Sequence, residues 1–417
     1  MTGAVALART RPAVSAFLGT AGVNGLILAF GLLTGIISAR LLGPDDRGEF
    51  LVVLLWSGVI SNFALLGLDQ ALIFGSSGSL GRGLAYASAL RRRVAVQGAL
   101  GFVLAFVVNL LLLKGADQQV VAQAALGALV VPLNAATQLR INPLLAGGRY
   151  TSWNLIRLAS PSTYLLGLGA LAVLDEVTVT TGLAVLAGGS AASSVLAVWH
   201  ARLPKKSAGF TPDVPALVRY GRGTVLVTLS YQVATQVDQL ILGAFAPAAS
   251  LGIYAVAVSV VSALDVIRLT ADQFLFPRYA ARGWIRSAIR RNSMAAAALV
   301  ALIGLSVLPF ARAAIELVYG GDYVAAVDPL RVLLAAGACR IGIAVLGAAL
   351  RASGHLSMVT KTQVLGIAVS IAALIVLLPR YGVMGAAISV LLSQFVCFAV
   401  LFKRIPDRSS PPGGSEA

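Results

Sequence analysis

Charged residues are scarce in this chain: Asp, Glu, Lys and Arg make up only 12% of its 417 residues, whereas apolar residues make up 58%. The mean hydropathy is +0.88. A water-soluble domain of this length needs more polar surface than such a composition supplies. The shortage of charge therefore excludes an ordinary soluble globule, and the long apolar runs between Ala13 and Phe402 indicate a polytopic membrane protein.

Cysteine and histidine are nearly absent, with two residues of each kind. Cys339 and Cys397 both fall inside apolar runs, so they predict neither a disulfide framework nor a metal site. The sequence also has no P-loop, no zinc-ligand spacing and no run long and polar enough for a soluble catalytic domain. We therefore expect a transporter with no catalytic residues and no bound cofactor, for which a proton or sodium gradient is the expected driving force.

Apolar runs of about 20 residues, the length that spans a bilayer as an α-helix, predict an all-α integral membrane protein with about twelve transmembrane helices. Membrane strands would instead show weak alternation over about ten residues. The predicted helices are residues 13–38, 50–73, 94–113, 119–139, 153–174, 178–199, 223–245, 252–275, 294–311, 325–350, 361–378 and 382–402.

Basic residues outnumber acidic ones, 32 to 16, and most of them fall in every second connection between the predicted helices. Because loops rich in Lys and Arg stay on the cytoplasmic side, this alternation predicts that both termini are cytoplasmic. The net charge of +16 is thereby explained by membrane topology, and no nucleic-acid partner is expected.

Turn residues recur with an offset of about 203 residues, which predicts two halves related by a parallel internal repeat. Pro44 and Gly48 follow the first predicted helix, and Pro247 and Gly252 follow the seventh. Because six helices separate the equivalent positions, both halves enter the membrane from the same side. The predicted organisation is a six-helix lobe at 1–200, a basic cytoplasmic linker at 201–222, a second six-helix lobe at 223–402 and a disordered cytoplasmic tail at 403–417.

Several segments resemble the polysaccharide flippases (Wzx-type) of the multidrug/oligosaccharidyl-lipid/polysaccharide exporter superfamily. The matching segments are ARLLGPDDRGEF at 39–50, LGLDQA at 66–71, DQLILG at 238–243, LGIY at 251–254 and YGVMGAA at 381–387. The resemblance implies a flippase of the bacterial cytoplasmic membrane that moves an undecaprenyl-diphosphate-linked oligosaccharide to the outer leaflet. It also implies that the ligands are this lipid-linked oligosaccharide and membrane lipids, and that polysaccharide polymerase machinery is the partner.

Ionisable residues inside predicted helices are candidate functional residues, because a charge in the bilayer is costly without a partner or a wet cavity. Asp265, Arg268 and Asp272 have spacings that place them on one face of the helix predicted at 252–275. Two interpretations stay open for them. They form either a salt-bridge cluster between helices or a cavity wall that contacts sugar hydroxyls, the diphosphate or a coupling cation.

Asp238 is the candidate coupling residue, because no basic residue accompanies it at helical spacing in its own helix. Gln232 and Gln236 belong to the same polar side of that helix and are candidates for contact with sugar. The alternative is that this polar side only joins neighbouring helices.

A second polar stripe contains Asn134 and Gln138 in the fourth predicted helix, and the repeat places Arg340 in the corresponding helix of the second half. Since a guanidinium suits bidentate contact with phosphate, we expect Arg340 to bind the diphosphate in a central cleft. Arg157, near the start of the fifth helix, is expected to extend its head to the membrane interface.

Two other functions are compatible with parts of this pattern. A cation-coupled drug or metabolite antiporter of the same superfamily would share the architecture and differ in its cargo. A membrane polysaccharide polymerase or glycosyltransferase would act on the same lipid-linked sugars, but the short connections leave little room for a catalytic domain.

Overall fold

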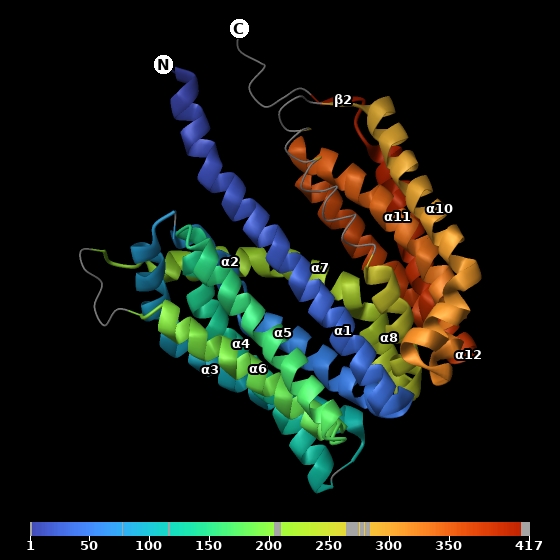
Figure 1. The fold of residues 1–417 in the computed structure, drawn as a ribbon. Coiled ribbons are helices and arrows are strands. Elements are labelled where there is room, and N and C mark those ends of the chain that lie inside the picture. The colour runs from blue at the N-terminus through green and yellow to red at the C-terminus, as the bar shows by residue number, and fades with distance from the viewer. Residues whose placement is uncertain are drawn as a thin grey trace. The chain divides into compact units, whose positions relative to one another are not determined.

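The chain folds almost entirely into α-helices, as a computed structural model shows (Figure 1). The structure describes residues 2–76, 78–115, 117–203, 210–263, 275, 279 and 284–409, with side chains from residue 19 on except those of 226–232 and 408–409. Two compact units divide the chain. Unit 1 comprises Met1–Leu42 and Glu49–Leu229, and unit 2 comprises Gly43–Gly48 and Ser230–Ala417.

Most elements belong wholly to one unit, while α1 and α7 each contribute to both. The first elements are α1 (Thr2–Ala64), α2 (Leu68–Ser76), α3 (Leu80–Leu113), α4 (Gln118–Ala146), α5 (Tyr150–Val173), α6 (Val179–His200) and α7 (Val214–Phe245). The later elements are α8 (Ala248–Ser262), β1 (Trp284–Ile285), α10 (Arg286–Tyr319), η1 (Gly321–Ala326), α11 (Val327–Ala352), α12 (Leu356–Arg404) and β2 (Arg408–Ser409).

Eight helices of the described part of the chain are long and apolar enough to cross a membrane. They include α1 and α12, which are 63 and 49 residues long and each cover two of the helices predicted from sequence. The helix α7 is not among these eight, which are counted over the described residues alone. The prediction of an all-α membrane protein is confirmed.

Two glycines with positive φ divide α1 and α12 each into two helical stretches, as the predicted helix pairs require. Gly43, in α1, has φ 72° and ψ 176°, and Gly382, in α12, has φ 53° and ψ −129°. Only glycine adopts these backbone angles readily, so the chain bends sharply at each position with no loop between the helices. The second predicted helix, 50–73, is also corrected, because α1 ends at Ala64 and α2 is a separate short helix.

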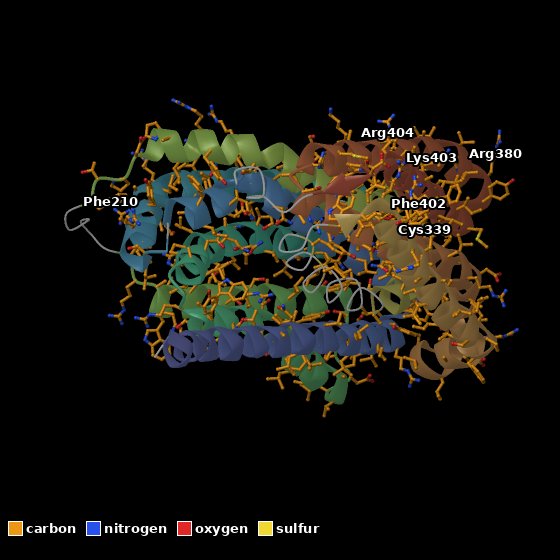
Figure 2. The ribbon with its side chains drawn as sticks, turned by 90° about the horizontal axis from the view of Figure 1, so that it is seen from above. Phe210, Cys339, Arg380, Phe402, Lys403 and Arg404 are labelled. Atoms are coloured by element: carbon orange, nitrogen blue, oxygen red, sulfur yellow. The ribbon has the colours of Figure 1, made fainter. Side chains whose placement is uncertain are left out.

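The predicted linker and tail are shorter than the sequence suggested. Residues 214–222 belong to α7 rather than to a linker, and Lys403 and Arg404 complete the last turn of α12 (Figure 2). The remaining boundaries of the predicted lobes stay a prediction.

The start of the predicted tail is ordered by contacts with the beginning of α10. β2 pairs antiparallel with β1, and Figure 1 shows β2 beside the start of α10. Arg286 forms an ion pair with Asp407 at 2.7 Å and donates to the Lys403 carbonyl at 2.9 Å. Arg290 donates to the Phe402 carbonyl at 2.8 Å. These arginines satisfy carbonyls that the end of α12 leaves without helical partners, so residues 403–409 are not a disordered tail.

The kinked segment Gly43–Gly48 packs against the start of α8 within unit 2. A Cβ added at Gly48 would collide with the Ala248 carbonyl, and one added at Gly252 would collide with the Pro44 carbonyl. These two glycines are the positions that the sequence repeat equates. Neither position has room for a side chain, because each glycine touches the backbone of the other segment.

Arg47 attaches the same segment to residues from later in the chain. Arg47 is only 2% exposed, although it falls in the connection between the helices predicted at 13–38 and 50–73. Its Cζ lies 5.9 and 5.4 Å from the ring centroids of Tyr319 and Tyr323, and Nη1 donates to the Gly252 carbonyl at 3.5 Å. A guanidinium held between aromatic rings away from water is stabilising, by about 2 kcal/mol when desolvated.

We expect Arg47→Met to lower the Tm of the purified protein by several degrees, because methionine fills the space but removes the cation–π contacts. For a unit of about 200 residues, 2 kcal/mol corresponds to about 4–8 °C. The measurement is thermal unfolding in detergent, with Arg380→Met as a control at an exposed arginine (Figure 2). Equal Tm values for the two variants would show that Arg47 does not stabilise this contact.

Candidate functional site

Unit 2 contains a cavity of about 330 Å³ among α7, α8, α11 and α12. Apolar residues such as Val258, Leu333 and Ile367 form part of its wall, but many of the lining side chains are polar. The polar lining residues are Thr235, Gln236, Asp238, Gln239, Ser262, Arg340, Arg351, Thr362, Gln363, Ser370, Ser393 and Gln394.

Asp238 contributes a carboxylate to this lining, and it is held by a tyrosine. Tyr254, on α8, is fully buried and donates from its hydroxyl to Oδ2 of Asp238 at 2.5 Å. Arg340, on α11, lies near enough for its positive charge to act on both groups. The three residues thus bring an acceptor, a neutral donor and a cation close together, with Asp238 and Arg340 lining the cavity and Tyr254 behind Asp238.

Two arginines of α11 face the cavity on one side of the helix. Arg340, Ala344, Gly347 and Arg351 line the cavity at spacings of four, three and four residues, the pattern of a single helical face. The eleven residues from Arg340 to Arg351 correspond to a rise of about 16 Å. A Cβ added at Gly347 would lie 3.6 Å from Nη1 of Arg351, so this guanidinium lies back along α11 beside the glycine.

Because α12 bends, both of its halves contribute a glutamine to the cavity lining. Ser393 donates to the Gly366 carbonyl at 2.8 Å and the Cys397 thiol to the Thr362 carbonyl at 3.3 Å, so the two halves of α12 run back against each other. A Cβ at Gly366 would meet the Cys397 sulfur at 2.5 Å, which makes glycine necessary for this close approach. Gln363 and Gln394 reach the cavity from these two halves.

The structure brings three of the residues singled out from sequence into this cavity: Asp238, Gln236 and Arg340. Gln232 lies in α7, but its side chain is outside the described set. The predicted cluster of Asp265, Arg268 and Asp272 lies outside the described residues.

The other two sequence candidates, Asn134 and Gln138, lie on α4 in unit 1 and do not line this cavity. Asn134 donates from Nδ2 to Ser61 Oγ at 2.8 Å, and the neighbouring Thr137 shares a hydrogen bond with Ser194 at 2.8 Å. These hydrogen bonds join α4 to α1 and α6, as polar side chains do between membrane helices. Gln138 is half-buried on the same helix.

Sequence reasoning missed Tyr254 and Arg351. Tyr254 lies in the LGIY segment that carried part of the family resemblance, but no local spacing links it to Asp238, sixteen residues earlier. Arg351 falls just after the helix predicted at 325–350, in a connection between predicted helices. Its spacing from Arg340 on one helical face was a usable signal.

The comparison with known families decides the classification. The profile of the family described as "Polysaccharide biosynthesis protein" matches residues 15–281, which is more than half of the chain. The chain belongs to this family. A comparison with curated proteins finds no significant match.

Solved structures show which fold this polysaccharide biosynthesis family member has. It is similar to "Lipid II flippase MurJ, inward closed conformation", with a TM-score of 0.69 and 11% identity over 92% of this chain and 86% of that chain. It is also similar to an inward-facing multidrug resistance MATE family transporter of the MOP superfamily, with a TM-score of 0.71 and 12% identity over 90% and 92% of the two chains. A third similar structure is that of the MATE multidrug transporter DinF-BH, with a TM-score of 0.65 and 12% identity over 94% of both chains. At these identities the likeness establishes the membrane-transporter fold and leaves cargo open.

Proposed function

We propose that this family member is a flippase that moves an undecaprenyl-diphosphate-linked oligosaccharide across the bacterial cytoplasmic membrane by alternating access. The observation that carries the proposal is a cavity lined by arginines and glutamines in a member of a polysaccharide biosynthesis family. Arginine suits a diphosphate, and glutamines suit sugar hydroxyls. In this proposal the chain performs no bond chemistry, both termini are cytoplasmic, and polysaccharide polymerase machinery receives the product.

Arg340 is the proposed diphosphate ligand. It faces the cavity from the middle of α11, whereas Arg351 lies at the end of the same helix. A cargo with its charge at one end and a neutral glycan along the rest is matched by arginines on α11 and glutamines on α7 and α12. A drug cavity would more often have a predominantly apolar and aromatic lining.

A binding measurement tests the proposed cargo. Purified protein should bind undecaprenyl-diphosphate oligosaccharide, and undecaprenyl diphosphate should compete, whereas the uncharged alcohol undecaprenol should not. Competition by undecaprenol of equal strength would mean that only the hydrocarbon is recognised, and the proposal would fail.

Asp238 is proposed to couple transport to a proton or sodium gradient. It is 6% exposed, lines the cavity and is held by Tyr254, so that protonation or cation binding at its carboxylate would change the polar contacts between α7 and α8. We expect Asp238→Asn to remove the dependence of transport on the imposed gradient while keeping downhill exchange. The readout is exchange rate with and without proton and sodium gradients; an unchanged gradient response in the variant excludes this role.

The antiporter alternative has one supporting observation, the resemblance in fold to MATE transporters, and the same Asp238 would serve it. The two functions are distinguished by the cargo that the protein moves. Gradient-driven uptake of a cationic dye by wild-type protein, in the absence of any binding of the lipid-linked oligosaccharide, would favour the antiporter.

A further inference from the structure

Four polar side chains meet between α1 and α5 within unit 1. Thr20 and Asn24 lie one turn apart on α1, and Asn154 and Arg157 lie one turn apart on α5. Asn154 donates from Nδ2 to Thr20 Oγ1 at 3.1 Å, and Arg157 donates from Nη2 to Asn24 Oδ1 at 2.9 Å. We call these four residues the α1–α5 polar patch. Arg157 is therefore hydrogen-bonded to α1; its predicted extension to the membrane interface stays a prediction.

The patch contains polar atoms that form no hydrogen bond with any described residue. Arg157 Nη1 and Asn154 Oδ1 are both buried without a hydrogen-bond partner among the described residues, and Asn154 is only 8% exposed. No acidic side chain in the described ranges forms an ion pair with Arg157. Contacts between helices explain the groups that are satisfied, but they leave one guanidinium nitrogen and one amide oxygen buried without hydrogen bonds, which is costly.

On α5, which is long and apolar enough to cross a membrane, the patch lies near the N-terminal end of the helix. Asn154 and Arg157 are the fifth and eighth residues of α5, hence about 6 and 10 Å from its start. Trp153 lies beneath the guanidinium, with Cζ 4.2 Å from the ring centroid. Leu26 and Leu155, on the same two helices, are 45% and 48% exposed. A cation, an aromatic ring and nearby exposed leucines are suited to a charged headgroup with its hydrocarbon chain.

We propose that the α1–α5 polar patch binds the phosphate group of a membrane lipid. Because a guanidinium is a planar fork, Arg157 can keep its bond to Asn24 while Nη1, after a small side-chain movement, donates to a phosphate oxygen. Where the headgroup carries a hydroxyl, as in phosphatidylglycerol, Asn154 Oδ1 accepts from it. The phosphate belongs either to a phospholipid headgroup or to a polyprenyl carrier; the contact of the phosphate with Arg157 is the same in both. This site is separate from the cavity of unit 2, and its test requires no transport.

The test is the Tm of the purified full-length protein with three added lipids: dioleoylphosphatidylglycerol, undecaprenyl phosphate and dioleoylglycerol, which lacks phosphate. At least one phosphate lipid should raise the Tm by several degrees, and dioleoylglycerol should not. Arg157→Gln should abolish the rise, whereas Arg149→Gln, at the exposed arginine that precedes α5, should keep it. The phosphate lipid that acts at the lower concentration identifies the source of the phosphate.

Three results would overturn the proposal: an equal rise with dioleoylglycerol, an undiminished rise in Arg157→Gln, or an equal loss of the rise in Arg149→Gln. If Arg157→Gln does not fold, Arg157→Lys retains the charge without the fork and should keep only part of the rise. Native mass spectrometry of the wild type gives a second readout, in which failure to retain either phosphate lipid also contradicts the proposal.

Discussion

Replacing Arg340 by alanine is expected to slow leaflet exchange of the lipid-linked oligosaccharide at least about tenfold, because a charge-assisted hydrogen bond contributes about 1.5–3 kcal/mol. Arg340 faces the cavity of unit 2, where its charge also acts on Asp238 and Tyr254. Arg340→Lys should be intermediate, since lysine keeps the charge but not the planar fork. The measurement is exchange of a fluorescent lipid-linked oligosaccharide in liposomes.

The matched control is Arg331→Gln on the same helix. Arg331 is 55% exposed and pairs with Asp328 at 2.8 Å, outside the cavity, so its loss should leave exchange within about twofold of wild type. Wild-type exchange by folded Arg340→Ala and Arg340→Lys proteins would remove Arg340 from the proposed diphosphate site.

Adding one methyl group at Gly48 is expected to destabilise the protein strongly. The Cβ of Gly48→Ala would overlap the backbone of Ala248, and backbone cannot move aside by changing rotamer. Overpacking of this kind typically costs about 1–3 kcal/mol and sometimes more. Because the segment also carries Arg47, its displacement would disturb the contacts with Tyr319 and Tyr323. We expect a clear loss of folded protein, measured by size-exclusion chromatography and Tm.

Gly58→Ala provides the control within the same helix. Nothing lies within 4 Å of a Cβ added at Gly58, and alanine favours helix by up to about 1 kcal/mol relative to glycine. This variant should fold as well as wild type or better. Equal stability of the Gly48→Ala and Gly58→Ala proteins would contradict the close packing of the kinked segment against α8.

The fold class was predictable from sequence because the apolar runs have the length that a membrane demands, and each of the twelve predicted helices overlaps a helix of the structure. The sharp bends at Gly43 and Gly382, which leave no loop between the paired helices, were not predictable, since glycine marks a loop and a bend equally well. Arg47 shows a second limit. Charge counting treats it as a loop residue, whereas two aromatic rings from a distant segment bury it.

The candidate site was predictable only in part. Asp238, Gln236 and Arg340 stood out because polar groups are unusual in apolar helices, and all three line one cavity. Tyr254 was missed because its role depends on a contact between helices, and Arg351 because its place at the end of an apolar run hid its spacing from Arg340. Asn134 was also singled out as a polar residue in an apolar helix, but its side chain forms a hydrogen bond to Ser61 between helices and does not line the cavity.

The most direct test of the proposed function is leaflet exchange of a fluorescent undecaprenyl-diphosphate oligosaccharide in liposomes that contain the purified wild-type protein, measured with and without proton and sodium gradients. The proposal predicts exchange well above that of protein-free liposomes. Exchange no faster than in protein-free liposomes, from protein that is folded and inserted, would contradict the assignment as a flippase for this cargo.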